Sequence, residues 1–296
     1  MIMAVGKNFD GSIEYVVEDS YGAGAGTDPT MLAISDFVTN VTIGVGDEHD
    51  VLKSITSQNI VDYFKKPRDY TLHIEYIPQN ETFLDDVITR TNGILQSLFF
   101  DVGVNVSQST SSYFQCKGCK PKTVRIEGRN GETWKITVDF SVKDITTSTS
   151  AIDVGTGSHA SSIGTDPLSF NVAGSITYGG SEVAYITDAI SIEVDNGLTD
   201  LWDVGSLTKK ACDESGTISI TGSCDITLDD GGKELWGNII NGTENTLVVN
   251  MGSTGAPKIT LTGVRFKSLE IPQDIGGGTI IQSVPFTAKT ISIGTV

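Results

Sequence analysis

The chain has 296 residues, 38% of them hydrophobic and 19% charged, so it is long enough for two ordinary domains with cores of their own. Its 37 acidic and 20 basic side chains give a formal net charge of −17, which excludes tight nucleic-acid binding, because affinity for phosphate comes from Lys and Arg. The abundance of Gly, Thr, Ser, Val and Ile favours strands and turns over helices.

The amino-terminal segment precedes the first predicted strand. Residues 1–7 lack a basic region followed by a long apolar run, and no apolar run approaches the roughly 18 residues that cross a bilayer. We therefore expect no secretory signal, no membrane span and reduced thiols. The Gly-rich segment 22–26 is followed by a strand pattern rather than a helix, so it indicates a flexible connector and not a phosphate-binding loop.

A half-buried strand is predicted at Val41–Val45, where every second residue is apolar. The same pattern returns 149 positions later at Ile190–Val194. It is the first of five matches that occur in the same order in both halves of the chain. Such ordered self-similarity indicates a tandem duplication.

A long polar segment, Asp47–Asp69, follows this strand, and Asp195–Gly216 is its counterpart in the second half. Both are predicted as irregular loops, and loops of this length are usually functional or disordered. The first carries six apolar residues with no place in the core of the repeat: Val51, Leu52, Ile55, Ile60, Tyr63 and Phe64. Burying apolar surface is worth about 25 cal/mol per Å², so these residues predict a contact with another subunit or a stacked ring. The alternative is that the loop folds back onto its own domain.

The remaining elements complete the match. A strand at 72–76 corresponds to 224–228, a helix at 83–88 to 235–240, a strand at 98–103 to 247–252, and closing strands at 138–145 to 284–291. Residues 147–166 are rich in Ser, Thr and Gly and predict a linker. We therefore expect a mainly β (α+β) protein of two tandem β-sandwich or barrel domains, residues 1–146 and 167–296, each with a short flanking helix.

Cys116-Lys117-Gly118-Cys119 is the motif best suited to carry chemistry, because it places two thiols close together. A zinc site needs four ligands. Cys224 falls at a core position of the repeat, where it is expected to be a small buried hydrophobic residue, and Cys212 is given no role. A loop disulfide or two free thiols is favoured, in an insert that the second half lacks.

The three histidines suggest no catalytic triad and no metal site. His49 lies in a polar loop, His159 in the linker, and His73 on the polar face of a strand. We therefore expect no catalytic residue, no cofactor and no metal ligand, and the chain is not expected to be an enzyme.

The order of strand, long loop, strand, helix and closing strands, ending in Val284-Pro285-Phe286-Thr287-Ala288-Lys289, resembles the tail tube proteins of tailed bacterial and archaeal viruses. The resemblance covers the chain twice, from about Ser12 to Ile145 and from Leu168 to Ile293. It implies a structural subunit of the virion tail, assembled in the host cytoplasm. Members with one domain form six-fold rings, so three two-domain chains would make a pseudo-six-fold ring.

The resemblance further implies that the rings stack into a tube, with inner strands joined into a continuous barrel through which DNA passes without specific binding. The expected partners are the chain itself and other tail proteins. The alternative function is a carbohydrate-binding or adhesive β-sandwich module, which requires exposed aromatic side chains. Trp134 begins a strand and Trp236 matches the core residue Leu84, which leaves Trp202.

Overall fold

A computed structural model describes residues 11–26, 28–46, 49–53, 60–107, 110–153, 158–170, 174–182, 186–227, 230–268 and 281–296. The first half contains β1 (Gly11–Val17), β2 (Leu32–Ala33), β3 (Val38–Gly46), β4 (His49–Lys53), β5 (Ile60–Lys65), β6 (Asp69–Tyr76), α1 (Thr82–Ile88), β7 (Arg90–Thr91), β8 (Ile94–Leu95), β9 (Leu98–Ser107), β10 (Thr110–Arg129), β11 (Lys135–Val142) and β12 (Asp144–Ser148). The second half contains β13 (Ser175–Tyr178), β14 (Ser181–Glu182), β15 (Ile186–Asp195), β16 (Thr199–Trp202), β17 (Lys209–Asp213), β18 (Ser219–Thr227), α2 (Asp230–Asn241), β19 (Asn245–Asn250), β20 (Pro257–Phe266), β21 (Ile281–Ala288) and β22 (Thr290–Thr295).

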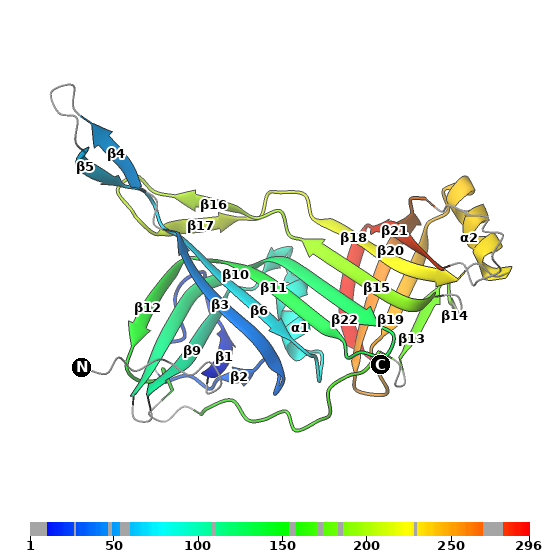
Figure 1. Cartoon of the computed structure of the whole chain (residues 1–296), viewed down its shortest axis with the longest axis horizontal. Coiled ribbons are helices and arrows are strands. Elements are labelled where there is room, and N and C mark those ends of the chain that lie inside the picture. The colour runs from blue at the N-terminus through cyan, green and yellow to red at the C-terminus, as the bar shows by residue number, and fades with distance from the viewer. Residues whose placement is uncertain are drawn as a thin grey trace.

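A central antiparallel sheet runs through both halves in the order β3-β6-β11-β10-β15-β18-β21-β20 (Figure 1). Two smaller sheets join it, because β10 and β20 are each shared between sheets. The first part of β10 pairs with β9 and β12, and the first part of β20 pairs with β19 and β22. The prediction of a mainly β chain with two short helices is confirmed. Neither helix in the described part of the chain has the length and apolar character of a membrane span.

The two halves follow one pairing scheme. In the first half β3 pairs with β6, β6 with β11, β11 with β10, β10 with β12 and β9, and β9 with β1. In the second half β15 pairs with β18, β18 with β21, β21 with β20, β20 with β22 and β19, and β19 with β13. Each strand of this scheme therefore has a counterpart at the same place in the other half.

The ladders correct the register of two sequence matches. Val41 lies opposite Ile74, and Ile190 lies opposite Cys224, so Cys224 takes the place of Ile74 and not of Leu72. By the same reasoning Leu247 takes the place of Phe100. Both errors are shifts of two positions. Side chains alternate between the faces of a strand with a period of two, so a shift of two preserves the apolar pattern and the sequence alone does not reveal it.

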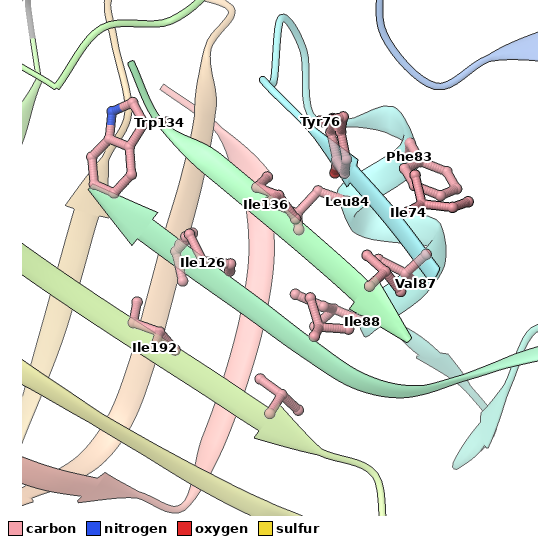
Figure 2. Close-up of a cluster of buried hydrophobic side chains, with 14 of the residues drawn as sticks. Ile74, Tyr76, Phe83, Leu84, Val87, Ile88, Ile126, Trp134, Ile136 and Ile192 are labelled. Carbon is pink, nitrogen blue, oxygen red and sulfur yellow. The ribbon is translucent and has the colours of Figure 1, made fainter. Parts of the chain in front are cut away.

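One hydrophobic core extends across both halves. Figure 2 shows Ile136, Ile126 and Ile192 in a row across β11, β10 and β15, and these three residues lie directly opposite one another in the ladders. Between the sheets of the first half the core is aromatic. The rings of Tyr15 and Phe83 are 4.8 Å apart, and those of Phe100 and Phe140 are 5.0 Å apart, separations at which aromatic pairs attract.

The Cys116–Cys119 motif lies inside β10, so the prediction that it belongs to an inserted loop was wrong. Both thiols are free and fully buried, and burial raises the pKa of Cys116 to about 12. Cys116 lies opposite Ile145 as Leu261 lies opposite Ile291, which makes the cysteines the counterparts of core residues Leu261 and Val264. The glycine between them has a positive φ of 65°, close to the 63° of Gly263, so both halves bulge at the same place.

The Gly-rich segment after β1 has a defined structure and is not a loose connector. The carboxylate of buried Glu18 accepts hydrogen bonds from the backbone N–H groups of Gly22, Gly24 and Gly118, at 2.8, 3.0 and 3.1 Å. Gly22 and Gly24 have positive φ, which glycine adopts without strain. The segment is therefore folded around one carboxylate.

The predicted linker is fastened to the first half. Asp36 accepts hydrogen bonds from the N–H groups of Ile163 and Gly164 at 3.0 and 2.8 Å. The bond from Gly164, followed by those from Gln79 and Ser162, lowers the pKa of Asp36 to about 2. Farther on, the N–H of Leu168 donates to Pro78 and that of Phe170 to Glu132. Figure 1 shows the segment running along one side of the molecule from the first half to the second.

Candidate assembly surfaces

The joint between the halves is a seven-residue antiparallel ladder of β10 and β15, from Thr123 opposite Asp195 to Arg129 opposite Ala189. Its core-facing residues are buried on both sides: Val124 and Ile126 on β10, and Ile192 and Val194 on β15. Helix α1 of the first half contacts β22 of the second. The joint therefore combines strand pairing with a helix laid against the neighbouring small sheet.

Trp134 packs at the end of this joint, with its ring centroid 5.1 Å from that of Phe170. Gly128 makes room for both rings, because a Cβ atom there would come within 2.5 Å of each. This close approach explains a glycine in the interior of β10. The aromatic pair attaches the end of the linker to the joint.

The β16–β17 hairpin of the second half lies against the first half through a buried cation. The side chain of Lys209 is fully buried, and its Nζ lies 2.7 Å from Oδ1 of Asp69, 2.8 Å from Oδ2 of Asp200 and 2.8 Å from Oγ of Ser141. Glu214 forms a second set of contacts, with Lys120, with Arg90 at 2.8 Å and with the N–H of Leu95 at 2.9 Å. Buried charges of this kind persist only where they are paired.

Strand β3 is the counterpart of β15 but lies at the end of the central sheet, and β6 is its one partner strand among the described residues. Val41, Ile43 and Val45 stand where β15 has Ile190, Ile192 and Val194. Val45 is 62% exposed, whereas Val194 is 1% exposed. An apolar groove of about 420 Å³ runs between these residues of β3 and Val104, Phe114 and Ile145 of the small sheet.

Helix α2 has a similarly uncovered apolar face at the other end of the molecule. Its Trp236 and Ile240 are 41% and 68% exposed, although their counterparts on α1, Leu84 and Ile88, are buried. The prediction that Trp236 belongs to the core is therefore wrong for the single chain. The match with Leu84 concerns position along the helix, and α1 is covered because the second half of the chain packs against it.

The two long polar segments form hairpins and not irregular loops. In the first, β4 and β5 pair with Val51 opposite Tyr63, Asp50 opposite Phe64, and Lys53 opposite Ile60. Leu52 lies opposite Asp62, and Ile55 is outside the described residues. In Figure 1 this hairpin extends beyond the body of the first half, whereas β16–β17 lies along it, and the N–H of Arg68 donates to the carbonyl of Leu207 at 2.9 Å.

The sequence predicted contact residues in the first hairpin, which stay a prediction, and it gave no indication that β3 and α2 are uncovered. Their apolar patterns are those of ordinary core elements, so they were assigned to the core. A usable signal was the asymmetry of two halves with similar patterns in one chain. A joint between two halves that share one pairing scheme leaves one unmatched surface at each end of the pair, and here those surfaces are β3 and α2.

One repeated pairing scheme, with a strand edge and a helix face left uncovered, places the chain in a β-rich class of protein. The chain belongs to the phage tail tube protein family, because the family model described as "Phage tail tube protein" matches residues 2–288. The protein is thus a structural component of a virion tail.

Comparison with curated proteins gives no match. Among solved structures, the chain is similar to one chain of a structure described as "Cryo-EM structure of the anti-feeding prophage (AFP) baseplate, 6-fold symmetrised". The identity is 9% and the TM-score 0.33, over 46% of this chain and 90% of that chain.

Proposed function

We propose that the protein is the repeating subunit of a tail tube, in which three chains join head to tail into a ring. We also propose that residues 1–146 and 167–296 are tandem copies of one domain joined by a linker at 147–166. The single observation that carries the proposal is the contrast between β15, which β10 covers, and its counterpart β3, which is uncovered in the single chain.

The contact between the two halves of one chain serves as the template for the proposed contact between neighbouring chains. Within one chain, β10 and α1 of the first half meet β15 and β22 of the second. Replacing each element by its counterpart places the β20 end and α2 of one chain against β3 and β12 of the next. Such a contact would cover Val45, Trp236 and Ile240, whose burial is worth about 25 cal/mol for each Å² of apolar surface.

This contact joins two different surfaces, so it propagates from chain to chain until the ring closes. Three chains supply six domains, which is the number that the resemblance to one-domain tail tube proteins implies. Closure would also remove the open edge of β3, which otherwise invites uncontrolled pairing.

The polar face of the central sheet is the proposed lining of a channel for DNA. Two of its cations are paired with carboxylates, because Arg125 Nη2 lies 2.5 Å from Glu193 and Lys135 Nζ lies 3.2 Å from Glu75. The His73 ring nitrogen Nδ1 also lies 2.6 Å from Asp139. A cation already paired attracts phosphate weakly, and the net charge of −17 opposes retention of DNA. DNA would pass without specific binding.

The β4–β5 hairpin is the proposed contact arm between subunits or stacked rings. Its counterpart, β16–β17, lies on the first half of its own chain through Lys209 and Glu214. By the same substitution of counterparts, β4–β5 of one chain would lie on the second half of the preceding chain in the ring. Val51, Leu52, Ile55, Ile60, Tyr63 and Phe64 are the residues we propose for this contact. Other tail proteins would meet the ends of the tube.

The test places a charge on the uncovered strand. Val45→Glu leaves the fold intact because the residue is 62% exposed, but a carboxylate in the joint would prevent ring formation. Val204→Glu is the matched control, since Val204 is fully exposed in the turn between β16 and β17. Mass photometry of the purified proteins should show three-chain rings for the wild type and the control, and monomers for Val45→Glu. Rings in Val45→Glu would reject β3 as the joint.

A further inference from the structure

Four titratable residues from three separate parts of the chain meet beside the small sheet of the first half. Glu14 on β1 lies directly opposite Asp101 on β9. Asp153 and His159 come from the segment that leaves β12 towards the second half. The donor atoms of Glu14, Asp153 and His159 all lie within 4.8 Å of one another.

The spacing of these atoms suits ligands of one metal ion. His159 Nδ1 lies 2.9 Å from Oδ2 of Asp153 and 3.3 Å from Oε1 of Glu14. Ligands bound at about 2.0–2.1 Å in a tetrahedron stand about 3.4 Å apart. The contact of His159 with Asp153 is close but outside hydrogen-bonding geometry, as is expected of lone pairs directed at a common centre and not at each other.

Buried oxygens of Asp101 and Asp153 accept no hydrogen bond from the described residues. The side chain of Asp153 is 1% exposed, and neither of its oxygens accepts a hydrogen bond from the described residues. Oδ1 of Asp101 is likewise buried without a donor, while its Oδ2 accepts a hydrogen bond from the N–H of Ile152 at 2.7 Å. Burying a carboxylate without a partner is costly, so a cation is the missing component.

The electrostatics of Asp101 agree with this geometry. Burial, together with the neighbouring charges of Asp153 and Glu14, raises the pKa of Asp101 to about 6, against the opposing effects of the hydrogen bond from Ile152 and of His159. A divalent cation among these carboxylates would relieve the repulsion between them.

We propose that Glu14, Asp153 and His159 bind one Zn²⁺ ion, with Asp101 as a positioning residue that holds Asp153 through Ile152. One imidazole and two carboxylates, completed by water, form a donor set that Zn²⁺ accepts. Ca²⁺ and Mg²⁺ fit less well, because hard cations take oxygen ligands and not imidazole. His159 is 64% exposed, which leaves a path for the ion.

The ion would fasten the connecting segment to the first half. Ser158, next to His159, forms a bridge with Thr30, and its carbonyl accepts from the N–H of Met31 at 3.0 Å. Zinc would add a further attachment, between this segment and β1. The site is independent of ring formation, because all its ligands belong to one chain.

The experiment is zinc titration of the full chain after removal of metal with EDTA, followed by calorimetry, and by Co²⁺ absorption as a probe of tetrahedral geometry. The variants are His159→Ala, Asp101→Asn and His73→Ala. His73 is the matched control, because it also lies beside two carboxylates, Asp139 and Glu75, but on the central sheet.

We expect one Zn²⁺ per chain and an intense Co²⁺ spectrum. His159→Ala should weaken binding at least tenfold, and Asp101→Asn should weaken it roughly tenfold, as loss of an outer-shell partner does. His73→Ala should bind as the wild type does. Absence of stoichiometric zinc binding, or equal affinity in His159→Ala and the wild type, would overturn the proposal.

Discussion

Several buried polar residues lie where the second half of the chain meets the first. Lys209, fully buried, contacts Asp69 on β6 and Ser141 on β11, while Glu214 contacts Arg90 and Lys120. An ionic contact fixes geometry more narrowly than an apolar one, because removing either partner leaves the other charge uncompensated. These residues therefore determine how the β16–β17 hairpin lies on the first half.

Lys209→Met should lower the free energy of unfolding by about 3 kcal/mol, the lower end of the range for breaking a buried pair, since Asp69 is partly exposed. Lys210→Met is the matched control. Lys210 and its partner Asp203 are both more than half exposed, so its loss should cost less than about 0.5 kcal/mol. Urea denaturation of the unassembled chain measures both. Equal effects of the two substitutions would contradict the role given to Lys209.

The burial of a single residue could be predicted from the sequence more reliably than the residues that it contacts. Cys224 is buried, and His73 lies on the polar face of its strand, both as expected from alternation along a strand. The partners of Lys209 and of His159 lie more than 50 residues away in some cases, as with Ser141 and Glu14. Only the folded sheet brings such residues together, so spacing along the chain gave no signal for them.

At the scale of elements, the order of strands and helices followed from apolar periodicity, whereas the two hairpins were missed. Both segments lack the regular alternation of apolar residues from which strands are predicted, so neither hairpin gave that signal. The ends of β3 and β6 remain paired beneath β4–β5, with Gly46 opposite Asp69. A short turn between β3 and β6 could therefore replace the hairpin without loss of their pairing.

Replacing residues 49–65 with a short Gly-Ser turn should leave a soluble, folded chain that no longer forms tubes. The same replacement of residues 199–213 is the contrasting case, because it removes Lys209 and should destabilise the chain itself. Circular dichroism and urea denaturation report folding, and negative-stain electron microscopy reports tubes. Full-length tubes from the first variant would exclude the β4–β5 hairpin as a contact arm.

At the scale of the whole molecule, the central sheet runs through both halves without a break, and its edge strand β3 has one partner strand among the described residues. One row of apolar residues runs from Val41 on β3 through Ile74, Val138, Val124 and Val194 to Ile220 on β18. The row crosses the joint between the halves without interruption and ends at the exposed edge of β3. The sequence predicted a repeat, but which half contributes the open edge depends on which strands meet at the joint.

The direction of assembly can be tested by mixing two variants that are each blocked at one end. Val45→Glu blocks the β3 surface, and the double variant Trp236→Glu, Ile240→Glu blocks the α2 surface; all three residues are more than one-third exposed, so both chains should fold. Each variant alone should be a monomer of about 31.4 kDa. In a head-to-tail joint, an equimolar mixture has one intact pair of surfaces, so it should form a species of two chains and nothing larger. A two-fold symmetric joint of β3 with β3 would instead let the double variant dimerise alone and leave Val45→Glu monomeric in the mixture, an outcome that light scattering would separate from the expected one.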